Sequence, residues 1–327
     1  MTIYRSLIAL ALLLTMLTVI LSAYIRLAEV GIGCENWPQC YAELDPGAEK
    51  KGITVLTQSG RDMAYYPARV AHRYIASTLG VFIVVIFVVA LRKRGKHATS
   101  ALIPAAIFAI TVFLSVLGYY TPTRINPLIT MGNLLGGMAL LGLLWWLLQR
   151  EIQGAEVLPG SAKLRPLAAL ALGLVVLQIV LGGWSSANYA SASCPGLVRC
   201  EGGMLRAEYV ADAFNPLRTI ALDERGQVIR SESLAVLTMA HRLFALLTAG
   251  YLAWLVRRLR SVSTLTGTVI FLSLFSIGQL AVGISTVWFN MPLTLLTLHN
   301  CMAAGLLLGC INLLHRLVPP AGSRPPG

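Results

Sequence analysis

Charged residues are scarce in this chain of 327 residues. They make up only 12% of the sequence, whereas hydrophobic residues make up 56%. A soluble globular protein carries about 25% charged residues. The shortage of charge, together with long apolar runs, argues against a soluble protein and indicates a polytopic membrane protein. The net charge of +12 does not indicate nucleic-acid binding, because the basic residues stand at the ends of apolar segments and form no phosphate-binding face.

Two cofactor signatures are also missing from the sequence. There is no Cys-x-x-Cys-His motif, so covalent attachment of haem through cysteine is not indicated. There is no nucleotide or flavin motif either. If the chain carries out redox chemistry, its electrons are expected to be exchanged with a partner or with a quinone-like pool.

Eight apolar segments are long enough to cross a bilayer, which takes about 20 helical residues. They lie at about 6–25, 70–91, 100–119, 127–148, 166–184, 235–256, 265–287 and 293–314. Since the backbone must satisfy its own hydrogen bonds inside hydrocarbon, we predict an all-α protein with eight transmembrane helices. A cleaved signal peptide is the alternative for the first segment, but its removal would leave an odd number of helices.

The basic residues predict how the chain is oriented. One side of the membrane receives Arg5, Arg92, Lys93, Arg94, Lys96, Arg150, Lys163, Arg165, Arg257, Arg258, Arg260 and Arg316. Short basic loops mark the cytoplasm, so both termini are predicted to be cytoplasmic. The two long loops, 26–69 and 185–234, then lie on the outer side, where disulfides persist.

The chain repeats a cysteine pair followed by Ala-His-Arg at the start of an apolar segment. The pairs are Cys34 with Cys40 and Cys194 with Cys200, and the two histidines are His72 and His241. Five residues separate the cysteines in each pair, and the pairs lie 160 positions apart. We therefore predict an N-terminal half at 1–150, a cytoplasmic linker at 151–165 and a C-terminal half at 166–327. The halves are expected to be four-helix bundles related by a pseudo-twofold axis along the membrane normal.

Two histidines of the second half are expected to lie at similar depth. His241 and His299 each stand about two turns into a segment that enters from the outer side. Ionisable residues inside a membrane are costly and mark functional sites. Two imidazoles at one depth suit axial coordination of a haem iron. The alternative is a pair of hydrogen-bonded core histidines.

The first half offers only one such histidine. The position that aligns with His299 is Gly132, or Asn133 if the alignment slips by one. His72 would then have an open opposite side, which could admit a substrate, a labile ligand or water, or could mark a lost site. The remaining histidines, His97 and His315, stand beside basic residues at the inner ends of segments and are predicted to be interfacial.

The arginines and cysteines near these histidines each have two possible roles. Arg73 and Arg242 either pair with haem propionates, which an arginine fork suits, or reach to lipid headgroups. The two cysteine pairs are predicted disulfides, and a thiol metal site is less expected in an oxidising compartment. Each disulfide is either a structural staple or redox-active. Cys301 and Cys310 lie within the last apolar segment and are predicted to be packing residues.

The sequence resembles the haem A synthase family over nearly its whole length. The matching residues are the run Gly33-Cys34-Glu35-Asn36-Trp37-Pro38-Gln39-Cys40-Tyr41, His72-Arg73, Gln178 with Gly182, Cys194 to Cys200, His241-Arg242, Gln279 with Gly283, and His299. The resemblance implies oxidation of the haem O methyl group to a formyl group, which supplies haem A for cytochrome c oxidase. It also implies haem b held by His241 and His299.

The resemblance further implies a substrate haem near His72 in the first half and a redox or substrate-handling role for the Cys34–Cys40 disulfide. Expected partners are haem O, membrane lipid, haem O synthase, oxidase assembly factors and a second copy of the chain. The expected location is the inner (plasma) membrane, with the cysteine loops on the periplasmic side.

Two positions depart from the family pattern. The family usually has glutamate three residues before the first-half histidine, and here that residue is Arg69, which cannot act as a base because it stays protonated. The second departure is Gly132 or Asn133 in place of a histidine. These departures leave one alternative to an active enzyme, a catalytically inactive haem b protein of the same fold that acts in electron transfer or oxidase assembly. A separate alternative is a transporter or other integral membrane protein without haem.

Overall fold

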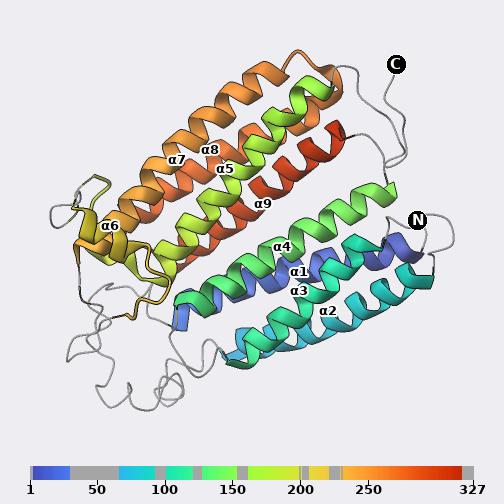
Figure 1. Ribbon diagram of the computed structural model, residues 1–327, viewed down its shortest axis with the longest axis horizontal. Coiled ribbons are helices and arrows are strands. Elements are labelled where there is room, and N and C mark those ends of the chain that lie inside the picture. Colours follow the sequence, from blue (N-terminus) through green and yellow to red (C-terminus); the bar gives the residue numbers. More distant parts are fainter. Residues whose placement is uncertain are drawn as a thin grey trace.

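A computed structural model describes residues 3–29, 66–92, 101–120, 127–152, 161–198, 200, 206–220, 229 and 231–318. Helix is the regular secondary structure of these residues (Figure 1). The long helices are α1 (Ile3–Glu29), α2 (Tyr66–Arg92), α3 (Leu102–Tyr120), α4 (Pro127–Ile152), α5 (Ser161–Ala187), α7 (Glu232–Leu259), α8 (Thr266–Trp288) and α9 (Leu293–Leu317). The all-α prediction is confirmed for this part of the chain.

Length and composition identify which helices can cross a membrane. Seven qualify among the described residues, namely α1, α2, α4, α5, α7, α8 and α9. The apolar part of α3, Leu102–Gly118, is shorter. The chain is therefore a multi-pass membrane protein. The first residues of α1 and the last residues of α9 lie at the same end of the molecule (Figure 1).

Several helices extend beyond the apolar segments that predicted them. Helix α1 continues to Glu29, so Arg26 belongs to a helix and not to the loop predicted at 26–69. Helix α4 continues to Ile152 and α5 begins at Ser161, so both ends of the predicted linker at 151–165 are helical. The physical reason is that arginine, lysine, glutamate and alanine are good helix formers, so charge ends an apolar run without ending the helix.

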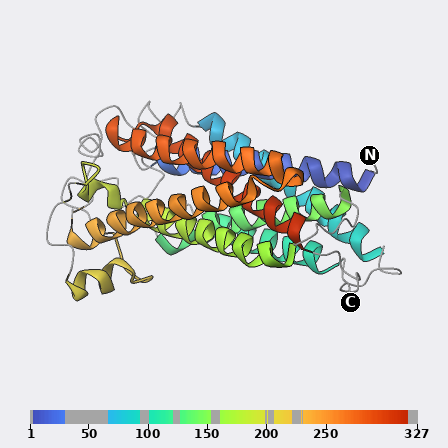
Figure 2. The same cartoon turned by 90° about the horizontal axis from the view of Figure 1, so that it is seen from above.

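The long helices pack as two groups of four in the same cyclic order. In the first group, α1, α2, α3 and α4 contact one another in sequence, and α4 closes the ring on α1. In the second group, α5, α7, α8 and α9 do the same. The groups meet through α1 and α4 on one side and α5 and α9 on the other. Figure 2 shows the same helices running close to the long axis of the molecule.

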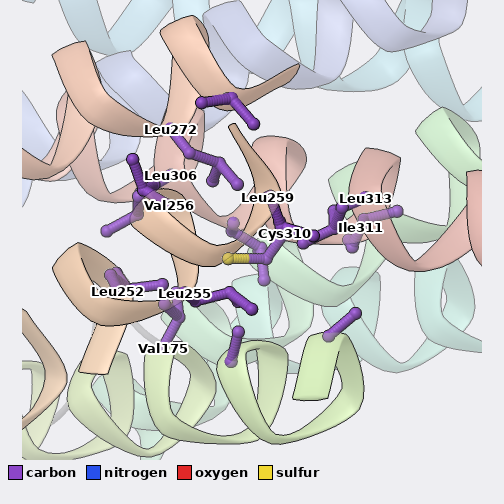
Figure 3. Packing of buried hydrophobic residues seen from close by; sticks show 14 of the residues in the cluster. Val175, Leu252, Leu255, Val256, Leu259, Leu272, Leu306, Cys310, Ile311 and Leu313 are labelled. Atoms are coloured by element: carbon purple, nitrogen blue, oxygen red, sulfur yellow. The ribbon is translucent and has the colours of Figure 1, made fainter. Parts of the chain in front are cut away.

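Each group has its own apolar core. The core of the first group includes Ile8, Ile83 and Ile107, which are fully buried. The larger core runs through the second group and crosses to Met138 and Leu141 of α4, so it also joins the groups. The part drawn in Figure 3 shows leucine, isoleucine and valine side chains around Cys310. Cys310 is a free, fully buried thiol, which agrees with its predicted packing role.

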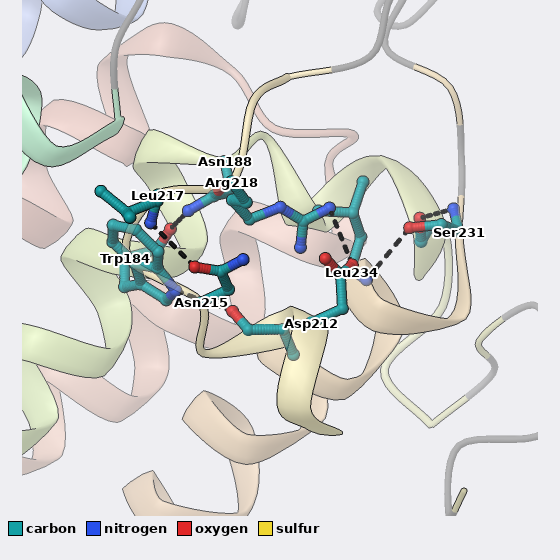
Figure 4. A network of polar contacts seen from close by, with 10 residues as sticks. Trp184, Asn188, Asp212, Asn215, Leu217, Arg218, Ser231 and Leu234 are labelled. Atoms are coloured by element: carbon teal, nitrogen blue, oxygen red, sulfur yellow. Dashed lines mark hydrogen bonds and ion pairs between the residues drawn. The ribbon is translucent and has the colours of Figure 1, made fainter. Parts of the chain in front are cut away.

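A small cap covers the end of the second group at which α5 ends and α7 begins (Figure 1). The segment between α5 and α7 contains a short helix, α6 (Ala207–Ala213), which the sequence did not predict. Trp184 of α5 donates from its indole nitrogen to the carbonyl oxygen of Ala213 at 2.9 Å, and Asp212 and Arg218 form an ion pair at 3.5 Å. Figure 4 shows this network. The cap is thus tied to the helix that carries Gln178 and Gly182.

Candidate functional site

His241 and His299 meet inside the second group of helices. His241 comes from α7 and His299 from α9. Their ring centroids lie 6.4 Å apart, and the ring planes are nearly perpendicular, at 83°. Residues separated by 58 positions in the sequence are therefore brought to one place.

A glutamine from a neighbouring helix holds each imidazole ring. Gln178 of α5 places its amide nitrogen 2.9 Å from Nδ1 of His241, and it also donates to the backbone carbonyl oxygen of His241 at 3.1 Å. Gln279 of α8 places its amide nitrogen 3.1 Å from Nε2 of His299. These partners fix the direction in which each ring points.

A glycine one helical turn after each glutamine makes room for the ring. A Cβ atom on Gly182 would lie 2.6 Å from Cε1 of His241, and a Cβ atom on Gly283 would lie 3.0 Å from Cε1 of His299. A side chain at Gly182 would collide with the His241 ring, and one at Gly283 would force the His299 ring to shift slightly. The spacing Gln-x-x-x-Gly thus builds the same slot twice, on α5 for one histidine and on α8 for the other.

The site contains buried polar atoms that no other described residue satisfies. They are Nδ1 of His299, Oε1 of Gln178 and Oε1 of Gln279. Leaving buried donors or acceptors without partners costs free energy. Such a cluster of orphaned atoms is expected where a further group completes the site.

A haem fits this arrangement better than a bare metal ion does. The ring centroids of His241 and His299 lie 6.4 Å apart, close enough for both imidazoles to serve one haem iron. The described residues contain no group of three or more histidine, cysteine, aspartate or glutamate side chains that could hold a metal. A porphyrin supplies the remaining ligands itself.

Arg242 has a role that the sequence did not predict. Its Nη1 donates to the carbonyl oxygens of Gly196, within hydrogen-bond range at 2.6 Å, and Leu197, at 2.8 Å, and its Nη2 donates to that of Cys194 at 3.2 Å. Cys194 and Cys200 form a disulfide. Arg242 therefore holds the disulfide loop close to His241, the residue before it in the sequence. From the sequence, we expected Arg242 to contact either a haem propionate or a lipid headgroup.

In the first group of helices, His72 lies half-buried on α2 and Arg73 is exposed beside it. Cys34, Cys40 and His97, together with the side chain of Arg69, lie outside the described part of the chain. His315 packs edge-on against Trp146, with ring centroids 5.0 Å apart, at the end of α9 away from His299. It takes no part in the histidine pair.

A glycine packs against a large side chain of the neighbouring helix in both groups, but the glycine lies on α8 in the second group and on α4 in the first. In the second group, the ring of His299 on α9 packs against Gly283 on α8. In the first group, Gly132 on α4 faces Leu117 on α3, and a Cβ atom on Gly132 would lie 2.6 Å from Cδ1 of Leu117. The space beside Gly132 is therefore filled by leucine on the α3 side.

The packing of Leu117 against Gly132 predicts how the protein tolerates a histidine at position 132. The variant Gly132→His is expected to lower the free energy of unfolding by about 1–3 kcal/mol, because the added ring overpacks against Leu117. Adding Leu117→Gly should recover part of the loss. Thermal unfolding in detergent measures both, and Gly118→His on α3, where a Cβ meets nothing within 4 Å, is the matched control. If the losses of unfolding free energy of the two single substitutions simply add up in the double variant, the proposed packing of position 132 against Leu117 would be contradicted.

The comparisons with known proteins place nearly the whole chain in one family. Residues 5–311 match the model of the COX15-CtaA family, described as cytochrome oxidase assembly protein. The chain is 31% identical over 318 residues to the haem A synthase of Shewanella oneidensis, and this match covers 95% of the chain and 96% of that protein. The chain therefore belongs to the COX15-CtaA family of cytochrome oxidase assembly proteins.

Proposed function

We propose that this membrane protein is a haem A synthase, which oxidises the methyl group of haem O to the formyl group of haem A for cytochrome c oxidase. The observation that carries the proposal is the paired histidine site, with its matched glutamines and glycines, in a chain similar over nearly its full length to a haem A synthase. Converting a methyl group to a formyl group removes electrons and protons from the substrate and adds an oxygen atom, so the enzyme needs an electron-accepting route and an oxygen donor such as water.

Haem b at His241 and His299 would provide the first part of that route. When bound, it supplies reversible one-electron chemistry. For each histidine to bind iron through one ring nitrogen, the other must carry the proton and donate it. The orphaned oxygens of Gln178 and Gln279 are suitable acceptors for those protons once the amides turn. These glutamines would then hold each ring in the orientation and tautomer that coordination requires.

The first half would bind the substrate haem, with His72 as its protein ligand. Leu117 fills the space beside Gly132 on the α3 side, which supports a single histidine ligand here. Arg73, exposed next to His72, is suited to a substrate propionate. The Cys34–Cys40 pair would take part in redox or substrate handling on the periplasmic side.

The same proposal covers the architecture and the surroundings of the protein. Eight transmembrane helices would form two bundles related by a pseudo-twofold axis, which is supported by the identical cyclic packing of the two groups. The protein would lie in the inner membrane with both termini in the cytoplasm, where the basic helix ends gather. Haem O synthase, oxidase assembly factors and a second copy are the proposed protein partners.

Removal of His72 tests whether the first half binds the substrate haem while the second half binds haem b. The variant His72→Ala is expected to lose haem A formation, because the substrate iron loses its protein ligand, while haem b stays bound at the other site. Chromatography of the haems extracted from cells that also make haem O measures both outcomes. The matched control is His315→Ala, whose ring packs on Trp146 and which should keep both haems. Haem A formation at the wild-type level in His72→Ala would contradict the proposed substrate site.

A further inference from the structure

Arg26 reaches from the first group of helices into the second. It lies near the end of α1, and its Nη1 donates to the hydroxyl oxygen of Ser186 at 3.3 Å. Its Nη2 donates to the side-chain oxygen of Asn300, also at 3.3 Å. An arginine near the end of a membrane helix usually extends toward water, but this guanidinium points across the interface between the two groups of helices, called the seam below.

Both partners of Arg26 border the paired histidine site. Ser186 lies one helical turn beyond Gly182, the glycine that faces the His241 ring, and Asn300 directly follows His299. The amide nitrogen of Asn300 donates to the carbonyl oxygen of Leu296 at 2.8 Å. This bond turns the amide oxygen of Asn300 toward Arg26, so the position of the guanidinium at the rim of the site is set by both helices.

Arg26 contacts neutral groups among the side chains that the structure describes. Its hydrogen bonds to Ser186 and Asn300 are long, and it also interacts electrostatically with the phenol of Tyr189. The ion pairs among these described side chains involve Arg206 and Arg218. A guanidinium has five N–H donors, and a cation held inside a membrane protein is costly unless an anion accompanies it. Arg242, by contrast, already donates to three carbonyl oxygens.

The internal repeat shows that only the first half has a positive charge at the position of Arg26. Arg26 stands eight residues before Cys34, and Ser186 stands eight residues before Cys194. The two residues that touch across the seam therefore occupy equivalent positions in the two halves. The first half carries an arginine where the second carries a serine, so the cation at the rim of the second site comes from the first half.

We propose that Arg26 binds a haem propionate at the seam between the two halves. The ligand is a carboxylate, which a guanidinium binds with charge-assisted and often bidentate hydrogen bonds. This inference rests on the proposed function, in which haem lies at His241 and His299. The carboxylate comes either from that haem b or from the substrate haem of the first half, and the test separates the two sources.

The test measures how fast haem leaves the purified holoprotein for an excess of apomyoglobin. The variant Arg26→Gln is expected to release haem roughly 10- to 100-fold faster than the wild type, the size of one charge-assisted hydrogen bond. Arg26→Lys, which keeps the charge, should recover part of the loss. Arg260→Gln is the matched control, because it makes the same substitution at an exposed arginine at the end of α7 away from His241, and it should release haem at close to the wild-type rate.

Haem dimethyl ester separates carboxylate binding from packing. Protein prepared with the ester has no propionate charge, so the wild type and Arg26→Gln should release it at the same rate. Faster release of the ester from Arg26→Gln would overturn the proposal, since the arginine would then act only by holding the helices together. Equal release of unmodified haem from both proteins, with the low-spin spectrum of the histidine pair intact, would overturn it as well.

The spectrum identifies the source of the carboxylate. Faster loss of the low-spin haem assigns the propionate to haem b, whereas faster loss confined to haem O assigns it to the substrate, and both results support the proposal. A wild-type protein that binds no haem would instead contradict the proposed function itself.

Discussion

Replacing either His241 or His299 with alanine is expected to abolish stable low-spin haem b binding. Each variant removes one of the two rings whose centroids lie 6.4 Å apart, and a low-spin iron with two imidazole ligands cannot form with one. The measurement is the ratio of haem to protein after purification, together with the absorption spectrum. We expect less than a tenth of the wild-type haem, because losing one axial bond removes several kcal/mol of binding free energy, and each 1.4 kcal/mol is about tenfold in affinity.

His315→Ala provides the control for this result. It also removes a histidine from α9, but from the end where the ring packs on Trp146. This variant should keep its haem and its low-spin spectrum. A normal low-spin haem in His241→Ala or His299→Ala would show that the iron ligands have been wrongly assigned.

Gly182→Val is expected to reduce haem b binding nearly as strongly, although glycine contributes no ligand. A Cβ atom at this position would lie 2.6 Å from Cε1 of His241, so the branched side chain must push the ring away from its place beside Gln178. Overpacking of this kind costs about 1–3 kcal/mol. At that cost the affinity for haem should decrease by roughly 5- to 140-fold, and haem content and the low-spin spectrum, measured as above, should both decrease.

The matched control lies on the same helix. Gly173 is also in α5, but a Cβ atom there meets nothing within 4 Å, so Gly173→Val should retain its haem. Gly283→Val should behave like Gly182→Val with a smaller effect, because its Cβ would lie 3.0 Å from the His299 ring. Wild-type haem content in Gly182→Val would mean that the ring does not occupy the slot beside Gly182 when haem is bound.

The sequence predicts the fold and the histidine pair because both depend on strong, local patterns. Apolar runs locate the helices, and the position of His241 and His299 along their segments predicts a common depth. The internal repeat then indicates which helices correspond. The cyclic packing of each group of four helices is consistent with that reading, and the disulfide between Cys194 and Cys200 lies in the predicted loop.

The supporting residues could not be assigned a role from the sequence. Gln178 and Gly182 can be recognised as part of a motif, but their contacts with His241 depend on how α5 is rotated against α7, which no local pattern specifies. Arg242 could not be connected with the carbonyl oxygens of Gly196 and Leu197, because the path of an irregular loop has no periodic signal. The backbone there offers acceptors that only the folded structure brings within reach.

Arg26 shows a different limit of sequence reasoning. Its charge ends the first apolar run, so hydropathy alone assigns it to the outer loop, whereas the helix continues to Glu29. An arginine one turn before the end of a membrane helix, aligned with a serine in the other half, is the signal that could have singled it out. Its contacts with Ser186 and Asn300 depend on packing between the halves and required the structure.

The most direct test of the central claim is chromatography of the haems extracted from the wild-type protein, expressed together with a source of haem O. Our account predicts haem b together with haem A or its hydroxylated precursor, which would show that the first half works with Arg69 and Gly132 in place. Haem b alone, at one per chain, would contradict the account and would favour a non-enzymatic haem b protein of the same fold.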